Sequence, residues 1–331
     1  MNIYNTIRKT TFYCALMAQL ILVALSLTAQ ANNRNQLKND TMKNEAVHYR
    51  NIEVNGLNIF YREAGPKDAP VILLMHGYPT SSFMFRNLIP MLSKKYRVIA
   101  PDIPGFGFSD APAREKYAYT FDNIANTMQG FIDALGLKRF AIYIFDYGAP
   151  VGLRLAIHNP EKITGIISQN GNAYEQGLLD WSHGRVKAYW EHDTKENRDA
   201  VRKFFTLEGT NFQYHEGVTD KSLISPDGIF QDQQLMNRPG NVEKQLDLLL
   251  DYRNNITLYP VFQKYFRDYK PKILAVWGSK DPYFSPAGAE GFKKDDPNTI
   301  VKFYDTGHFA LETNGKEIGQ DILDFMPGLP Q

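Results

Sequence analysis

The chain has 331 residues, which is enough for one large α/β domain with an insertion or for two smaller domains. Hydrophobic residues make up 43% of it and charged residues 22%, as in an ordinary globular protein. The formal net charge is +1 and no basic stretch stands out, so the sequence gives no electrostatic basis for binding nucleic acid.

The first 31 residues have the pattern of a secretory signal peptide. Arg8 and Lys9 provide a positive start, residues 15–27 are mostly apolar, and Ala29-Gln30-Ala31 fits a small-x-small cleavage site. We therefore expect cleavage after Ala31 and a periplasmic or secreted protein. The alternative is an uncleaved anchor, but the apolar run is short for a membrane span. We expect no membrane attachment after signal cleavage.

Cysteine is absent after the predicted cleavage point. The single cysteine, Cys14, lies inside the signal peptide, so the mature chain would have no thiol. This excludes a disulfide framework, a cysteine nucleophile and a cysteine-ligated metal in the mature protein. Residues 32–50, which follow the signal peptide, are polar and rich in Asn, and we predict a flexible N-terminal segment there.

From residue 51 onwards, the hydrophobic pattern predicts strands and helices in alternation. Residues 51–64 alternate between polar and apolar around Asn55-Gly56, which indicates a β-hairpin. Apolar runs typical of buried strands cover residues 70–75, 96–101, 141–145, 163–168, 271–277 and 299–304. Helical patterns cover residues 83–92, 121–137, 148–158, 286–292 and 309–325. This order predicts an α/β fold with a mostly parallel, doubly wound sheet.

The alternation stops near Asn172 and resumes at Pro271. Between these points the sequence is helical, charged and aromatic, with no convincing strand; residues 242–252 form one of its clearest helical pieces. We therefore predict a helical insertion of residues 172–269 in an α/β core formed by residues 51–171 and 270–331.

Three side chains suited to catalysis directly follow predicted strands. Asp146 follows the strand 141–145, Asp281 follows the strand 271–277, and His308 follows the last strand. Because the carboxyl ends of parallel strands meet at one edge of the sheet, we expect these side chains to lie close together. His308 can take a proton from water only if another group fixes its tautomer, and Asp281 is suited to that role.

Each of these residues also has a structural interpretation. Asp146 could cap the helix that follows it, Asp281 could belong to a turn, and His308 could be a helix-cap residue. The strand 163–168 ends without a carboxylate, which favours Asp281 as the acid. Other carboxylates that compete for this role are Asp110, Asp251 and Asp305.

With these motifs in place, the chain resembles the branch of the α/β-hydrolases that contains epoxide hydrolases and haloalkane or haloacetate dehalogenases. The resemblance covers nearly all of the mature chain, and its motifs are His76-Gly77-Tyr78-Pro79, Gly105-Phe106-Gly107-Phe108-Ser109, Asp146-Tyr147-Gly148, Gly278-Ser279-Lys280-Asp281 and Gly307-His308. It implies an α/β-hydrolase fold with residues 172–269 as a helical cap domain. The usual nucleophile elbow is Gly-x-nucleophile-x-Gly, and here Ile144 stands at the first glycine.

The resemblance also implies a two-step reaction without metal or organic cofactor. Asp146 would be the nucleophile that forms an alkyl-enzyme ester, and His308, supported by Asp281, would activate the water that hydrolyses it. The backbone N–H groups of Tyr78 and Tyr147 would form the oxyanion hole. The Tyr78-Pro79 peptide is a candidate cis bond.

Cap tyrosines would distinguish an epoxide from a halide substrate. An epoxide oxygen needs a proton donor, and the resemblance points to Tyr252 in Asp251-Tyr252-Arg253-Asn254 as the first choice. Tyr189 is a possible second donor and Tyr214 a weaker one, although aromatic residues in helices often serve only packing. Haloalkane dehalogenases typically carry Trp after the nucleophile and Asn or Glu at the position of Tyr78, whereas this chain has Tyr147 and Tyr78.

The sequence thus favours an epoxide hydrolase acting on a small apolar organic substrate. A haloalkane or haloacetate dehalogenase comes second; for a haloacetate, Arg86, Arg154 and Arg253 are the candidate partners of the substrate carboxylate. Another carbon–oxygen ester hydrolase comes third. A protein of this fold that binds a ligand without converting it is the alternative from a different class. The sequence carries no signal for an oligomeric state.

Overall fold

The structure of the protein is a computed structural model that describes Gln30 and residues 46–330. The predicted signal peptide, apart from Gln30, and most of the predicted flexible segment 32–50 lie outside the described residues, so these predictions and the predicted location stay predictions. In the part of the chain that the structure describes, no helix combines the length and the apolar character needed to cross a membrane.

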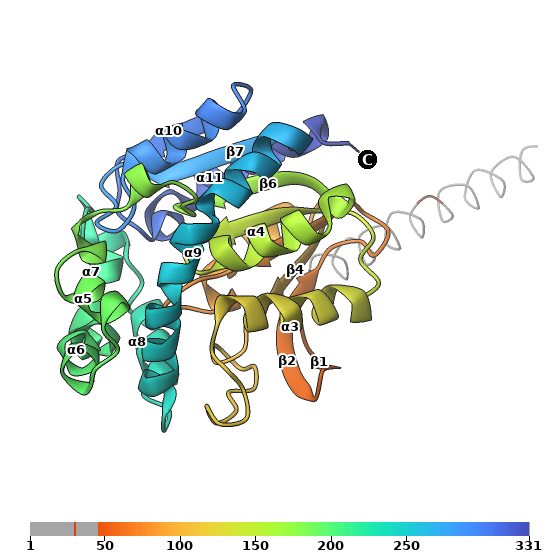
Figure 1. Cartoon of the computed structure of the whole chain (residues 1–331). Helices are drawn as coiled ribbons and strands as arrows, with labels where there is room; N and C mark the ends of the chain where they lie inside the picture. Colours follow the sequence, from red (N-terminus) through yellow and green to blue (C-terminus); the bar gives the residue numbers. More distant parts are fainter. Residues whose placement is uncertain (1–29, 31–45, 331) are drawn as a thin grey trace, which may run out of the picture. The chain divides into compact units, whose positions relative to one another are not determined.

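A single sheet of eight strands organises the described chain, in the order β1-β2-β4-β3-β5-β6-β7-β8 (Figure 1). Its strands are β1 (His48–Val54), β2 (Leu57–Ala64), β3 (Val71–Met75), β4 (Arg97–Pro101), β5 (Phe140–Phe145), β6 (Ile163–Gln169), β7 (Ile273–Gly278) and β8 (Ile300–Tyr304). β1 and β2 form the predicted hairpin, with Asn55 and Gly56 both at positive φ, and β2 pairs with β4 in antiparallel orientation. The other neighbours are parallel, which confirms the predicted α/β fold.

The central strands are apolar on both sides because helices cover both faces of the sheet. In β5, Ile142 and Ile144 belong to one hydrophobic cluster, whereas Tyr143 and Phe145 belong to the other. The first cluster is completed by α3 (Phe121–Ala134), α4 (Gly148–His158) and α10 (Pro286–Asp295). The second is completed by η1 (Ser82–Phe85), α2 (Ile89–Leu92) and α11 (Ala310–Phe325), the last interrupted at Asn314.

The prediction of one continuous helix over residues 83–92 is wrong, because the structure has two short helices there, η1 and α2. Ser81 caps the first of them, since its side chain accepts a hydrogen bond from the backbone N–H of Phe83 at 3.3 Å. Pro90 lies in the first turn of α2. It has no N–H to offer to a carbonyl four residues earlier, so a helix could not run through this point without losing a bond.

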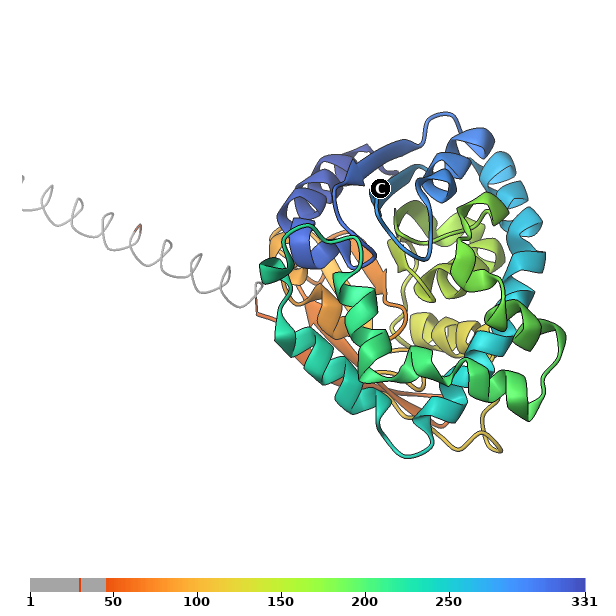
Figure 2. The ribbon, with the colours of Figure 1, turned by 90° about the vertical axis from the view of Figure 1, so that its left-hand side faces the viewer.

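Residues between β6 and β7 are helical, as predicted for 172–269. The elements are η3 (Glu175–Gly177), η4 (Asp180–Ser182), α5 (Arg185–Glu191), α6 (Lys195–Ala200), η5 (Arg202–Phe205), α7 (Leu207–His215), η6 (Lys221–Leu223), α8 (Pro226–Met236) and α9 (Asn241–Tyr269). Figures 1 and 2 show α5 to α8 gathered on one side of the sheet. Residues 242–252 are only the first part of α9, which continues through Pro260. The division into core and cap domains stays a prediction.

The turn after β5 is where α4 passes closest to the sheet. A Cβ at Gly148 would lie 2.4 Å from the carbonyl oxygen of Met75, and one at Gly152 would lie 2.5 Å from Cγ2 of Ile144. Both distances are far below van der Waals contact, so only glycine fits at these positions. Gly152 thereby makes room for the Ile144 side chain, which explains how isoleucine can stand where the usual motif has glycine.

Replacing Gly152 by Ala should destabilise the fold even though Ala is the better helix former. The added methyl would overlap Ile144, and overpacking of this kind costs about 1–3 kcal/mol of unfolding free energy. Urea denaturation of the variant measures this loss. In a double-mutant cycle, Ile144→Ala should cost less in the Gly152→Ala background than in the wild type. Gly315→Ala is the matched control, because a Cβ there meets nothing within 4 Å; strictly additive effects at 144 and 152 would contradict the steric explanation.

Candidate active site

Asp146 lies at the junction of β5 and α4, in a tight turn with φ of 47°. A non-glycine residue in this left-handed region carries strain of about 1–3 kcal/mol, which the surrounding structure must hold. The turn is held by a close approach of Gly77, where a Cβ would lie 2.5 Å from the Cβ of Asp146. The geometry pushes the Asp146 carboxylate out at the end of the strand, as a nucleophile elbow requires.

Backbone N–H groups hold the Asp146 carboxylate. The N–H of Tyr78 donates to Oδ1 at 2.6 Å, and the N–H of Tyr147 lies near enough to the carboxylate to lower its pKa. These are the two groups predicted to form an oxyanion hole, and the structure brings them together on this side chain. The Tyr78-Pro79 peptide is cis, as predicted.

His308 and Asp281 lie beside Asp146, as the chain order predicted. The Nδ1 atom of His308 is 2.8 Å from Oδ2 of Asp281, and its Nε2 atom is 3.7 Å from Oδ2 of Asp146. Nδ1 therefore carries the proton that binds the Asp281 carboxylate, which leaves Nε2 as an acceptor. Among the described residues, no group hydrogen-bonds to the buried Nε2 atom. It faces Asp146 with its lone pair free.

Asn170 at the end of β6 is a residue that the sequence reasoning missed. Its Nδ2 donates to Oδ2 of Asp281 at 2.6 Å, and its Oδ1 accepts from the N–H of Gly278 at 3.2 Å. The N–H of Tyr283 donates to the other oxygen of Asp281 at 2.7 Å. Both oxygens of this buried carboxylate are thus occupied, which fixes its orientation toward His308. The signal was available in principle, because Asn170 lies two residues after the predicted strand 163–168.

The competing carboxylates are engaged elsewhere. Asp110 accepts from the N–H of Asn58, Asp251 accepts from the N–H of Phe121, and Asp305 forms an ion pair with Lys280. The structure places Asp281, and none of these three, against His308.

Burial and charge shape the titration of the site. Burial raises the pKa of Asp146 to about 6, against the opposing effects of His308 and of the N–H groups of Tyr78 and Tyr147. Burial alone would lower the pKa of His308, but Asp281 and, less strongly, Asp146 raise it above its ordinary value. A deprotonated Asp146 and a His308 that gains and loses a proton near neutral pH are what an alkylation and hydrolysis cycle needs.

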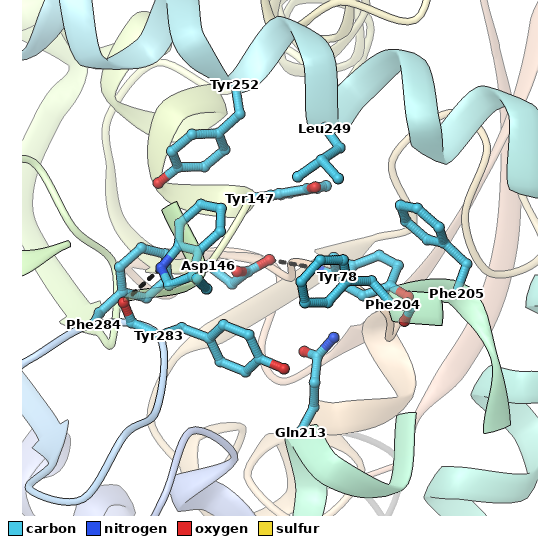
Figure 3. Close-up of a pocket in the computed structure, with 11 residues that line it drawn as sticks. Tyr78, Asp146, Tyr147, Phe204, Phe205, Gln213, Leu249, Tyr252, Tyr283 and Phe284 are labelled. Atoms are coloured by element: carbon cyan, nitrogen blue, oxygen red, sulfur yellow. Dashed lines mark hydrogen bonds between the residues drawn. The ribbon is translucent and has the colours of Figure 1, made fainter. Parts of the chain in front are cut away.

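A pocket with about 40 Å³ of free interior space opens above Asp146 (Figure 3). Its mostly aromatic lining suits a small organic molecule. The lining combines aromatic rings with a few polar groups: Tyr78, Asp146, Tyr147, Trp181, Phe204, Phe205, Gln213, Leu249, Tyr252, Tyr283 and Phe284. Burial raises the pKa of Tyr78, Tyr147 and Tyr252 well above the ordinary value, so these phenols stay neutral.

Tyr252 on α9 lines the pocket, as predicted for the proton donor. Its hydroxyl lies 3.3 Å from the hydroxyl of Tyr259, which accepts a hydrogen bond from Nδ2 of Asn172 at 3.3 Å. Because Asn172 can only donate through this atom, Tyr259 can pass its own hydrogen to the oxygen of Tyr252. The hydrogen of Tyr252 is then free for a ligand in the pocket.

The structure contradicts the expected second donors. The hydroxyl of Tyr189 donates to the carbonyl of Leu246 at 3.2 Å and accepts from Arg198 at 2.8 Å, and Tyr189 does not line the pocket. The hydroxyl of Tyr214 donates to Asp232 at 2.6 Å, and this residue too is absent from the lining. Sequence distance from Asp146 could not show this, because it does not tell toward which neighbours a side chain on α5 or α7 turns.

The tryptophan N–H groups, which are donors of the kind that can bind a halide, are occupied. Each tryptophan Nε1 donates to a backbone carbonyl: Trp181 to Tyr283, Trp190 to Leu249 and Trp277 to Phe284.

None of the three arginines considered for a substrate carboxylate lines the pocket. Arg86 binds Glu312 through two hydrogen bonds, Arg154 binds Asp122 and Asn255, and Arg253 binds the carbonyl of Trp190. Within the described ranges, no cluster of His, Cys, Asp and Glu side chains could hold a metal ion.

Comparison with known proteins agrees with this geometry. Residues 70–315 match a family described as alpha/beta hydrolase fold. An uncharacterized hydrolase of Saccharomyces cerevisiae is 46% identical over 286 residues, covering 85% of this chain and 98% of the relative. A haloalkane dehalogenase of Psychrobacter cryohalolentis is 40% identical over 292 residues, covering 84% and 90%.

Solved structures share the fold. The epoxide hydrolase CorEH aligns with a TM-score of 0.69 at 18% identity, over 86% of this chain and 99% of that one. DBJA aligns with a TM-score of 0.68 at 22% identity, over 86% and 98%. The chain belongs to the α/β-hydrolase fold family, and a haloalkane dehalogenase is among its relatives there.

Proposed function

We propose that this enzyme is an epoxide hydrolase in which Asp146 is the nucleophile. The observation that carries the proposal is Tyr252, a phenol that lines the pocket together with Asp146 and whose hydroxyl lies 3.3 Å from the hydroxyl of Tyr259. An opening epoxide needs a proton donor of this kind. A halide instead needs weak N–H or O–H donors, and the N–H groups of the three tryptophans, one kind of such donor, are all bound to carbonyls.

In the first step, Oδ2 of Asp146 attacks a ring carbon of the epoxide. Oδ1 is held by the N–H of Tyr78, so Oδ2 is the oxygen left to react. The carbon–oxygen bond breaks, and the departing oxygen takes the proton of Tyr252. The products of this step are a hydroxyalkyl ester of Asp146 and the phenolate of Tyr252.

In the second step, water attacks the Cγ carbon of the Asp146 ester. The free Nε2 of His308 accepts a proton from that water, while Asp281 stabilises the charged ring. The negative charge of the tetrahedral intermediate develops on Oδ1, to which the N–H of Tyr78 already donates, with the N–H of Tyr147 close to the same carboxylate. The diol leaves with the proton of His308, and the proton of the regenerated carboxylic acid returns to Tyr252.

A haloalkane dehalogenase is the second candidate, because a relative with that name is 40% identical over most of this chain. A haloacetate substrate is less well supported, since no basic side chain lines the pocket. A ligand-binding protein without turnover would have no use for the free Nε2 of His308 facing Asp146.

Blocking the second step should trap the ester on Asp146. In His308→Gln, incubation with styrene oxide should add the whole epoxide mass to a peptide containing Asp146, because nothing leaves when the ring opens. A bromoalkane would add only its alkyl group, so mass spectrometry distinguishes the two substrates. The control is His308→Gln combined with Asp146→Asn, which should form no adduct.

Adducts with bromoalkanes or haloacetates alone would replace the epoxide proposal with a dehalogenase. The absence of any adduct, together with equal ligand binding by Asp146→Asn, would favour a binding protein.

Removing the proposed proton donor should slow epoxide opening selectively. Tyr252→Phe should lower kcat for styrene oxide about a hundredfold to ten-thousandfold, the usual contribution of a positioned general acid. Tyr189→Phe is the matched control, because it removes a buried hydroxyl of the same helical insertion away from the pocket. Single-turnover kinetics of both variants measures the effect; equal losses in the two would contradict the role of Tyr252.

Activity should fall toward acidic pH. Only the ionised form of Asp146 can attack, and its pKa is raised to about 6, so kcat/KM should fall as pH drops below that value. The pKa of His308 is raised as well, so its neutral form is lost in the same direction. Steady-state rates measured between pH 5 and 9 test this; a profile that stays flat from about pH 5 to 8 would contradict both assignments.

A further inference from the structure

One side of the pocket carries a polar group that the proposed reaction does not use. Gln213, on α7, is 3% exposed and lines the pocket with its side chain. Figure 3 shows its amide next to the hydroxyl of Tyr283, with Tyr252 on the other side of Asp146 in this view. In the described part of the chain, no residue hydrogen-bonds to the Gln213 amide or to the Tyr283 hydroxyl.

An amide in this position is costly unless a ligand binds it. A buried polar group without a partner loses its hydration and gains nothing in return. Gln233, on the neighbouring helix α8, is a buried amide with protein partners. It accepts a hydrogen bond from Thr210 at 2.8 Å and donates one to Asn237 at 2.8 Å. Gln245 also lacks a partner, but it does not line the pocket. Gln213 differs from both because its amide faces the space where a substrate binds.

The charges around the pocket restrict what Gln213 can bind. The lining contains one carboxylate, Asp146, and no basic side chain. A substrate carboxylate would therefore lie near a negative charge without a counter-ion, which is strongly unfavourable in a buried site. An amide and a phenol each donate and accept hydrogen bonds, so together they suit a neutral hydroxyl, carbonyl or carboxamide group.

We propose that Gln213, with Tyr283, selects a neutral epoxide that carries a hydroxyl, carbonyl or carboxamide group beside the ring. This refines the expectation of an apolar substrate, and it rests on the proposed function. With the epoxide carbon at Asp146 and the ring oxygen at Tyr252, the remaining substituent extends toward Gln213. An apolar substituent there would leave the amide unpaired.

Matched substrates test this specificity. Glycidol and 1,2-epoxybutane have nearly the same shape and differ by a hydroxyl against a methyl group. The wild type should show a kcat/KM about tenfold or more higher for glycidol, the value of a hydrogen bond in a desolvated site. Gln213→Met keeps the length of the side chain and removes the amide. It should abolish this preference, because kcat/KM falls more for glycidol than for 1,2-epoxybutane. Gln213→Leu serves as a second variant in case Met perturbs the fold.

The control is Asn211→Met, which changes the same helix at a residue outside the pocket lining. It should keep the preference for glycidol. If the wild type turns over both epoxides and the glycidol preference survives in Gln213→Met, the specificity proposal is overturned while the epoxide hydrolase proposal stands. Equal losses for both substrates in Gln213→Met would also overturn it, since they indicate a structural role. If no epoxide is turned over and no adduct forms on Asp146, both proposals fail together.

Discussion

A carboxylate buried at the end of a parallel strand is unfavourable unless its neighbours compensate for the lost water, and the structure is arranged around this constraint at Asp146. The backbone N–H of Tyr78 binds its Oδ1 atom, the N–H of Tyr147 lowers its pKa, and Nε2 of His308 lies 3.7 Å from its Oδ2. Because residue 77 is glycine, its loop can pass close to the Asp146 side chain. Because residue 148 is glycine, helix α4 can begin close to the backbone of Met75. The groups that stabilise the carboxylate at rest are the same ones that the proposed reaction needs when its charge moves.

The helical insertion contacts the core at residues next to the reacting groups. The hydroxyl of Tyr78, whose N–H holds Asp146, donates to the carbonyl of Phe204 at 2.8 Å. On the other side, Tyr214 stacks on Phe309, the neighbour of His308, at 3.9 Å between ring centroids. Tyr214 is held in turn by Asp232, whose pKa burial raises to about 7. The insertion therefore closes the pocket and also packs on the loops that carry the oxyanion donors and the histidine.

The pocket is more polar than the predicted small apolar substrate would need. The aromatic rings around Asp146 exclude water, which raises the cost of every polar group left without a partner. Tyr252 meets this cost through the chain of hydrogen bonds to Tyr259 and Asn172. Gln213 has no such chain, and a polar substituent of the substrate would take its place.

Fold class and triad were accessible from the sequence because both depend on local patterns. Apolar runs, the Asn55-Gly56 turn and residues that directly follow strands predicted the sheet, and they predicted that Asp146, Asp281 and His308 would meet. The polar lining of the pocket was not accessible in this way. Helices of the insertion have aromatic and polar residues on several sides, and their spacing does not tell which side faces Asp146.

Only tertiary packing decided that Tyr189 turns to Arg198 and Leu246, that Gln213 enters the pocket, and that Asn170 orients Asp281. Strand ends are positioned by the sheet, so the sequence by itself determines that Asp146, Asp281 and His308 come together. Side chains on an inserted helix are positioned by contacts with distant segments, and those contacts exist only in the folded protein.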